Sequence, residues 1–409
     1  MNTSSSTKNP FNIIVIVAAL GYFVDIYDLI LFGIVRKPSL EAIGIPSDQL
    51  LEKGHFLLNM QMLGMLIGGI IWGILGDKKG RLSTLFMTIL LYSLANIANG
   101  FVENMTQYAV LRFIAGLGLA GELGIGITLV SEVMTKETRG YGTTIVSGVG
   151  IAGAALGFLI ADRFEWRMAY WVGGGLGLLL LALRVSVYES GMFVKAREHQ
   201  AERGNFLMLF SSGKKFFKYL YCILIGMPVW YVIGILVFSS PEFAKNVFHV
   251  DGDINGGKAI MYHYIGASIG SFVTGLISQW LKSRKKSILI AFISLTVFIG
   301  IFFMSYNTST SIFYCILFIL GIAQGYWAVF ITIASEQFGT NIRATVATTV
   351  PNFVRGSTVL MTISFEFIKK SNMWTAGVVV GGIIMLLAFF ALYKLKETYG
   401  KDLDYIEVE

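Results

Sequence analysis

Ionisable side chains inside long apolar segments are the residues of this chain best suited to chemistry. Asp25 and Asp28 lie three residues apart near the start of the 409-residue sequence, so one helix would carry both on one face. An ionisable group at bilayer depth is costly and needs a partner, a hydrated cavity or a function. Two adjacent carboxylates in a low dielectric cannot easily both ionise. The pair therefore favours reversible proton binding by Asp25, Asp28 or both, with a structural pair held by a neighbouring helix as the alternative.

Three further charged residues lie in later apolar segments. Arg112 lies ten residues before Glu122, about 15 Å along one helix, so the two are not direct partners. We expect Arg112 to pair with an acid of the first segment and count it also among the substrate-binding candidates. Glu122 is then a second proton or substrate site, or a buried residue bonded within the N-terminal half. The planar fork of Arg355 suits a carboxylate, so we predict that it binds an anionic substrate. An ion pair with Asp25, Asp28 or Glu122 is the alternative.

Weaker candidates are polar or aromatic residues of the same segments. His263 could sense pH, although a lone histidine near a helix end is also typical of the membrane interface. Six residues could line an aromatic-walled substrate cavity, with packing or interfacial anchoring as the alternative: Tyr27, Trp230, Tyr231, Gln324, Tyr326 and Trp327. Cys222 and Cys315 lie in separate apolar segments and form no ligand cluster. The sequence therefore predicts no metal site and no cofactor.

The composition places these residues in an integral membrane protein. Hydrophobic residues make up 55% of the chain and charged residues 14%, against about 25% charged residues in a soluble domain. The net charge of +7 fits cytoplasmic loops facing an anionic leaflet and does not indicate nucleic-acid binding. The sequence shows no nucleophile–base constellation, and its loops are too short for a catalytic domain. An enzyme is therefore not expected.

Twelve apolar segments are long enough to cross a bilayer as helices, which predicts an all-α membrane protein. Their approximate ranges are 11–35, 54–75, 82–101, 105–133, 139–162, 166–188, 217–240, 257–281, 287–306, 309–337, 342–369 and 373–395. The first segment is too long for a signal-peptide core and no cleavage site follows it, so we expect it to stay as a membrane helix. With both termini in the cytoplasm, 20 lysines and arginines lie on the cytoplasmic side and 9 on the other, which supports this orientation.

The sequence divides into two similar halves. The charged loop 189–216 separates an N-terminal bundle, residues 1–188, from a C-terminal bundle, residues 217–409. Matching features recur 204 residues apart: Gly121 and Gly325, Ser131-Glu132 and Ser335-Glu336, and Arg139 and Arg343. Internal duplication of a six-helix unit predicts two pseudo-symmetric bundles with a substrate site between them, the organisation of a secondary transporter.

A charged segment joins the second and third apolar segments. It reads Gly76-Asp77-Lys78-Lys79-Gly80-Arg81, and we predict a tight cytoplasmic turn against the helix ends. Shifted by 204 residues, it falls on 280–285, where the positive charge remains but both glycines and the acid are missing. We therefore expect an asymmetric gate, in which Asp77 matters for the transport cycle and the region of Ser283 matters mainly for topology.

These motifs resemble those of a known family. The segment 76–81 resembles the loop between helices 2 and 3 of the major facilitator superfamily. Residues 25–28 and 112–122 resemble helices 1 and 4 of its metabolite:proton and aromatic-acid:proton symporters. Residues 189–193 are similar to their signature after helix 6, with glycine where proline is usual, and 352–356 to their helix-11 arginine region. The resemblance to the superfamily covers the whole chain.

The resemblance implies where a gate and a cavity should lie. Helices 1, 4, 7, 8, 10 and 11 would line the cavity. Charges at cytoplasmic helix ends would join the two halves while that side is closed, with simple solvation of the loops as the alternative. The residues concerned are Gly76, Asp77, Gly80, Arg81, Glu132, Arg139, Glu336 and Arg343.

The function predicted from the sequence is transport of a small organic anion together with protons, by alternating access. We expect a monomer in the bacterial inner membrane, with small-molecule substrate, protons and lipid bilayer as its partners. Helix 5 lacks the Gly-Pro pair usual in proton-driven exporters of the superfamily, which favours uptake. The alternatives are an organic cation or metal ion as cargo, export by proton antiport, and a transporter-like sensor that moves nothing.

Overall fold

The computed structural model describes residues 13–79, 81–121, 139–189 and 206–401. These residues are helical apart from short connections and an isolated bridge between Asp251 and Ser309. The predicted all-α class is therefore confirmed for the described part of the chain. Backbone polar groups in lipid must be paired within their own segment, which is why helices dominate.

The helices of the first half are joined by close backbone contacts. Their bounds are α1 Ile13–Ala42, α2 Leu50–Lys79, α3 Arg81–Asn99, α4 Met105–Leu119, α6 Arg139–Ile151, α7 Gly153–Arg163 and α8 Trp166–Glu189. α2 packs on α4, and α1 packs on α6, α7 and α8. A Cβ added at Gly64 or Gly116 would lie 2.1 Å from a backbone oxygen of the facing helix. Small residues thus let α2 and α4 approach closely, as is usual between membrane helices.

The second half repeats this arrangement. Its elements are η2 Phe206–Phe210, α9 Gly213–Tyr231, the π-helix η3 Val232–Val237, α10 Ser240–Phe243, the π-helix η4 Ala244–Phe248, α11 Gly256–Trp280, α12 Arg284–Phe303, α13 Thr310–Gln324, α14 Trp327–Glu336, α15 Thr340–Lys369 and α16 Met373–Lys394. α11 packs on α13 through Gly266 and Gly321, whose added Cβ atoms would each lie 2.0 Å from the opposite backbone. The pair α11–α13 corresponds to α2–α4, as internal duplication predicts.

Helix ends also recur at matching positions in the described parts of the two halves. α13 ends at Gln324 and α14 begins at Trp327, and a Cβ added at Gly325 would lie 2.1 Å from the backbone of Gly270. In the first half α4 ends at Leu119, two residues before Gly121. The glycines matched at a spacing of 204 residues therefore lie at equivalent helix ends. The sequence predicted continuous helices at 139–162, 217–240 and 309–337, and the structure divides each of them into shorter elements.

Nine helical stretches among the described residues are at least 18 residues long and apolar enough to cross a membrane. They correspond to nine of the predicted spans. The other three predicted spans fall on α3, α4 and α15. The apolar run of α3 is short, the described part of α4 has 15 residues, and α15 is rich in threonine and other polar residues. The total of twelve spans stays a prediction.

The predicted turn at 76–81 falls on the junction of two helices. α2 continues to Lys79 and α3 begins at Arg81, while Gly80 between them lies outside the described residues, so the turn itself stays a prediction. One local prediction was wrong. α1 does not end near residue 35 but continues to Ala42 with Pro38 inside it.

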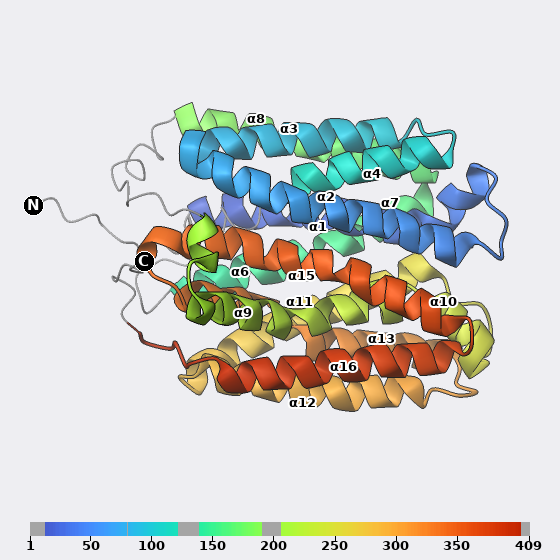
Figure 1. Cartoon of the computed structure of the whole chain (residues 1–409). Coiled ribbons are helices and arrows are strands. Elements are labelled where there is room, and N and C mark those ends of the chain that lie inside the picture. The colour runs from blue at the N-terminus through green and yellow to red at the C-terminus, as the bar shows by residue number, and fades with distance from the viewer. Residues whose placement is uncertain (1–12, 80, 122–138, 190–205, 402–409) are drawn as a thin grey trace, which may run out of the picture.

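Figure 1 shows the helices up to α8 gathered mainly on one side of the molecule and α9 to α16 on the other. The two groups meet where α2 packs on α15 and where α11 packs on α6, α7 and α1. α1 begins and α16 ends at the same end of the bundle (Figure 1). We call the opposite end, which carries residues 43–49 and 249–255, the distal end.

Candidate functional site

The first charged pair lies entirely within the first half. Asp28 on α1 and Arg112 on α4 are both fully buried and close enough for a Coulombic interaction. The guanidinium of Arg112 lies 5.5 Å from the ring centroid of Phe32 and 5.8 Å from that of Tyr170, and it donates a hydrogen bond to Gln61. Both oxygens of Asp28 lie buried without a hydrogen-bond partner among the described residues. The structure therefore places Arg112 near an acid of the first helix, and their pairing as a proton site stays a prediction.

Space for Asp28 is provided by α8. A Cβ added at Gly173 would lie 2.3 Å from Oδ1 of Asp28 and 2.7 Å from the ring of Tyr27. The Tyr27 hydroxyl donates to the Ala169 carbonyl at 2.8 Å. Tyr27 was predicted to line the substrate cavity, but this bond directs its hydroxyl to α8 inside the first half. Its position matches the packing alternative.

Hydroxyl groups connect this pair with the distal end. Tyr170, beside Arg112, shares a hydrogen bond of 2.7 Å with the hydroxyl of Tyr108. Tyr108 donates to Ser39 at 3.2 Å, and Ser39 donates to the carbonyl of Arg36 at 3.2 Å. All three hydroxyl-bearing residues are fully buried. The last turns of α1 are thereby tied to the interior of the first half.

The second charged pair lies where the two halves meet. Arg355 on α15 is 3% exposed and interacts electrostatically with Asp25 and Tyr22 on α1. Its guanidinium lies 5.7 Å from the ring centroid of Trp327, and its Nη1 donates to Asn352 at 3.2 Å. An arginine held between an aromatic face and polar groups presents the planar fork that a carboxylate fits. Asp25 is thus an acid that the structure places near Arg355, and the choice between an ion pair and a substrate site stays a prediction.

Asn352 anchors this arginine to the first half. Its amide donates to the Ala120 carbonyl, at the end of α4, at 2.8 Å. A Cβ added at Gly69 of α2 would lie 2.8 Å from the Asn352 Cβ. The Arg355 side chain is therefore positioned by both halves, and a rocking motion between them would change its surroundings.

Two further candidates, His263 and Gln324, bind each other. His263 on α11 is fully buried, with Nε2 at 3.0 Å from Oε1 of Gln324 and Nδ1 at 3.1 Å from the Leu317 carbonyl. His263 is therefore not the interfacial residue that its place in the sequence indicated, and it joins α11 to α13. Tyr326 donates to the Ile225 carbonyl at 3.0 Å, which is a packing role. Trp230 and Tyr231 are buried, and the Tyr231 hydroxyl donates to the Gly377 carbonyl at 2.7 Å.

At the distal end, polar side chains join the two halves directly. Arg36 on α1 forms an ion pair of 2.6 Å with Glu242 on α10. His55 on α2 lies 2.6 Å from Glu366 on α15, and Thr362 donates to Asn59 at 2.7 Å. Sequence reasoning missed these contacts. Arg36 and Glu242 are 206 residues apart, close to the repeat of 204, so charged residues at equivalent helix ends were a signal that could have found them.

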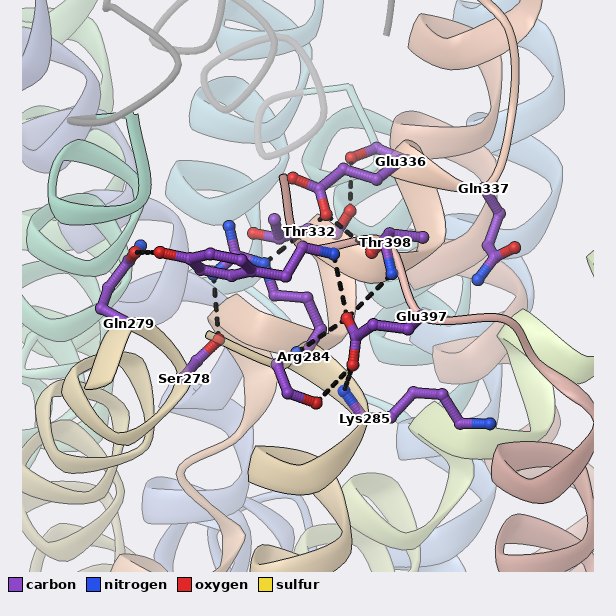
Figure 2. Close-up of polar contacts among 12 residues, drawn as sticks. Ser278, Gln279, Arg284, Lys285, Thr332, Glu336, Gln337, Glu397 and Thr398 are labelled. Atoms are coloured by element: carbon purple, nitrogen blue, oxygen red, sulfur yellow. Dashed lines mark hydrogen bonds and ion pairs between the residues drawn. The ribbon is translucent and has the colours of Figure 1, made fainter. Parts of the chain in front are cut away.

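At the other end of the bundle, the segment after α16 binds the start of α12 (Figure 2). Glu397 accepts hydrogen bonds from the backbone N–H of Arg284 at 3.0 Å and of Lys285 at 3.1 Å, and from the Ser283 hydroxyl. Partial burial raises the pKa of Glu397, but these bonds, with those from the next two backbone N–H groups, hold its pKa below the ordinary value of 4.5. The carboxylate missing from the second copy of the charged loop is thus supplied by the C-terminal segment.

Glu336 belongs to the same group of contacts. It accepts from Thr398 at 2.7 Å and lies 3.5 Å from Nε of Arg284 (Figure 2). Arg343 donates to the Phe338 carbonyl at 3.3 Å. The expectation that the region of Ser283 matters mainly for topology is therefore too narrow, because Ser283 also caps α12 and binds Glu397.

Comparison with known proteins identifies the family. The model of the Major Facilitator Superfamily matches residues 18–361. The chain belongs to this superfamily. A solved structure of the proton:xylose symporter XylE bound to 6-bromo-6-deoxy-D-glucose has the same fold, with a TM-score of 0.73, 15% identity and coverage of 96% of this chain and 97% of that one.

Curated relatives within the major facilitator superfamily are named as transporters. A probable 4-methylmuconolactone transporter of Cupriavidus pinatubonensis is 26% identical, covering 80% of this chain and 76% of the relative. The niacin transporter NiaP of Acinetobacter baylyi is 25% identical with 80% of each chain covered, and a gentisate transporter of Corynebacterium glutamicum is 24% identical with 93% and 88% covered. The predicted family is confirmed, and these names agree with the symporter branch that the motifs resembled.

Several predicted gate and proton residues of this major facilitator protein lie outside the described residues, or only their helical backbone is described. Glu122 and Glu132 lie outside the described residues. Gly76, Asp77, Arg81 and Arg139 are placed as helical backbone only, and Gly80 is not described. Within the described ranges, no group of three or more His, Cys, Asp and Glu could hold a metal ion.

Proposed function

We propose that this major facilitator protein takes up a small organic anion, in particular an aromatic carboxylate, together with protons across the bacterial inner membrane. It acts as a monomer with both termini in the cytoplasm and twelve spans in two six-helix bundles. The observation that carries the proposal is the placement of Arg355 between the halves, beside Asp25 and the Trp327 ring. Relatives named for niacin and gentisate support the substrate class.

In the proposed cycle, the substrate carboxylate and Asp25 compete for Arg355. Ionised Asp25 neutralises the arginine, whereas protonated Asp25 releases it for a substrate anion. The aromatic ring of the substrate then stacks near Trp327, and a bidentate ion pair fixes its orientation. Binding of proton and substrate in the same place couples the two, because the anion binds best after the proton.

Asp28 serves as a second proton site, inside the first half. Its carboxylate and Arg112 move together when the halves rock, so its protonation changes the charge of that bundle and not the contact between bundles. Glu122, on the segment after α4, is a further proton or substrate site in this proposal. The ion pair of Arg36 with Glu242 and the hydrogen bond between His55 and Glu366 hold the distal side closed. With the termini in the cytoplasm, the distal side is external.

Uptake into proteoliposomes tests the proposal. The purified full-length chain is reconstituted, and uptake of radiolabelled nicotinate and gentisate is measured with an imposed pH gradient, acidic outside. We expect accumulation that a protonophore abolishes and that exceeds the diffusion of the neutral acid into protein-free liposomes. The Arg355→Gln variant serves as an inactive protein control of the same topology.

Three outcomes would contradict it. Accumulation of an organic cation instead of an anion would indicate that the acids inside the membrane bind the transported cation. Accumulation that ignores the pH gradient would remove proton coupling. Movement of no solute, with specific binding retained, would indicate a sensor built on the transporter fold.

A further inference from the structure

A cavity at the distal end lies directly on the contact between the two halves. It has a volume of about 880 Å³ and lies among the end of α1, α7, α10, η4 and the start of α11. Pockets for small organic ligands have volumes of about 300–1,000 Å³ and combine apolar walls with a few polar groups. Residues that line this distal vestibule include Ile34, Arg36, Phe158, Glu242, Lys245 and Ile254.

The basic group of the vestibule is built into the fold. The side chain of Arg36 is 6% exposed, its stem packs against α2 where a Cβ added at Gly54 would lie 2.6 Å from Cδ, and its guanidinium lies 4.7 Å from the ring centroid of Phe238. Nη2 binds Glu242 at 2.6 Å. Nη1 of Arg36 and Oε2 of Glu242 are buried and have no hydrogen-bond partner among the described residues. Nη1 of Arg36 can therefore donate to a further acceptor, and Oε2 of Glu242 can accept from a further donor.

The charges around the vestibule favour an anion at Arg36. Four acids also line it, Glu41, Asp48, Asp162 and Asp253, but all four are exposed and solvated. Exposed charges are screened by water and salt, whereas a buried guanidinium is screened much less. Lys37 and Lys245 at the opening are exposed and screened in the same way, so the preference for an anion comes from the buried Arg36, while Ile34 and Phe158 offer an apolar wall.

We propose that the distal vestibule is a first binding site for the transported organic anion, whose carboxylate replaces Glu242 on Arg36. Displacing Glu242 breaks the ion pair between α1 and α10, so substrate arrival itself opens the distal side. Occupancy of the vestibule and closure by Arg36–Glu242 exclude each other. This inference rests on the proposed function for the substrate class and for the external position of the distal end.

Spin labels across the distal end provide the test. Glu103→Cys, between α3 and α4, and Ser371→Cys, between α15 and α16, are exposed positions on different halves, and Cys222→Ala with Cys315→Ser removes the native thiols. Electron–electron double resonance measures the label distance during titration with nicotinate. Nicotinamide is the neutral isostere, and 1-methylnicotinamide is the cationic one. We expect nicotinate alone to lengthen the distance.

Two substitutions in the labelled protein distinguish an anion-binding site from an ion pair that only holds the distal side closed. Arg36→Gln and Glu242→Gln both break the ion pair, so both should lengthen the distance without ligand. Because both variants open without ligand, their midpoints are read from equilibrium binding of radiolabelled nicotinate, and an anion site predicts opposite changes in the midpoint. Glu242→Gln removes the competitor and lowers the nicotinate midpoint, whereas Arg36→Gln raises it by about tenfold or more, as expected for loss of a charge-assisted bond. Lys53→Gln removes an exposed charge of α2 outside the cavity lining and should leave the midpoint unchanged.

The outcomes distinguish this inference from the proposed function. Equal nicotinate midpoints in Arg36→Gln and Glu242→Gln would show that the ion pair only holds the distal side closed and binds no substrate. This result would overturn the vestibule site even if proteoliposomes accumulate nicotinate. A response to 1-methylnicotinamide that Glu242→Gln abolishes would assign the site to cations. If nicotinate and gentisate are neither bound nor accumulated by the wild-type chain, the proposed function itself fails. Arg36→Lys, which keeps the charge but loses the fork, covers the case in which Arg36→Gln does not fold.

Discussion

Two carboxylate–arginine pairs lie one helical turn apart on α1, and they differ in what they join. Asp28 and Arg112 belong to the same half, in a fully buried setting closed by Gly173 of α8. Asp25 faces Arg355 of the other half, where the surroundings also include a tryptophan ring and a contact to α4. Equivalent chemistry therefore occurs in a rigid setting and in one that must change when the halves move.

This difference indicates that Asp25 and Asp28 have different roles, which their spacing of three residues in the sequence does not reveal. A pair within one bundle can store a proton without sensing the position of the other bundle. A pair across the interface changes its energy when the interface opens, so it can couple charge to motion. Replacing one partner of a buried charge pair costs about 2–5 kcal/mol, mostly because the other charge is left alone. Each pair should therefore respond strongly to substitution, but in different measurements.

The largest effect is expected at Arg355. Arg355→Gln should lower nicotinate uptake by about 100-fold or more, the equivalent of about 3 kcal/mol, because the substrate loses its bidentate partner. Arg355→Lys keeps the charge without the fork and should lose about tenfold. Initial uptake rates in proteoliposomes measure both. Wild-type uptake in Arg355→Lys would show that a point charge suffices and that no bidentate clamp forms.

The next effect separates the two acids. In the wild type, nicotinate affinity should fall as pH rises, because ionised Asp25 competes for Arg355. Asp25→Asn should remove this pH dependence of binding, whereas Asp28→Asn should retain it and lose accumulation driven by a pH gradient. Equilibrium binding between pH 5 and 8 and gradient-driven uptake measure the two properties. If Asp25→Asn and Asp28→Asn show the same pH dependence of binding and the same gradient-driven uptake, the two pairs do not have different roles.

A substitution at Gly173 of α8, which packs against Asp28, tests the pair Asp28–Arg112. Gly173→Ala places a Cβ where Oδ1 of Asp28 lies, and overpacking of this kind costs about 1–3 kcal/mol. We expect uptake to fall about tenfold, the effect of 1.4 kcal/mol, with a lower melting temperature. Gly175→Ala is the matched control, since its added Cβ meets no atom within 4 Å. Equal losses in both variants would indicate a general effect on α8.

The smallest effect is expected at Glu397, far from both pairs. Its pKa is held below the ordinary value of 4.5, so its stabilising effect is present above that pH and is lost as pH falls through the lowered value. Glu397→Gln should lower the melting temperature by about 2 °C. The difference from the wild type should be constant from pH 5 to 8 and shrink below pH 4.5. A change in the pH profile of uptake would place part of the proton coupling at this end.

The sequence could predict features that depend on local pattern. Apolar segments indicated helices, the repeat of 204 residues matched the interruptions near Gly121 and Gly325, and the depth of Arg112 indicated its acid partner. It could not predict contacts between distant helix ends, such as His55 with Glu366 or Ser283 with Glu397, because no pattern along the chain fixes which ends meet. The sequence placed the end of α1 near residue 35, but the helix continues to Ala42, because Pro38 is accommodated inside it.

The carboxylate that completes the start of α12 lies 113 residues further along the chain, after the final helix. During synthesis, the first N–H groups of α12 therefore have no Glu397 carboxylate to bind until the segment after α16 has left the ribosome. A chain released after Lys394 would keep the described helices and the Ser283 cap of α12, yet leave the N–H groups of Arg284 and Lys285 without this carboxylate. Nonsense or frameshift changes in the final codons should thus yield inserted protein that membrane quality-control proteases recognise, and a fusion partner should follow Thr398 and not replace it.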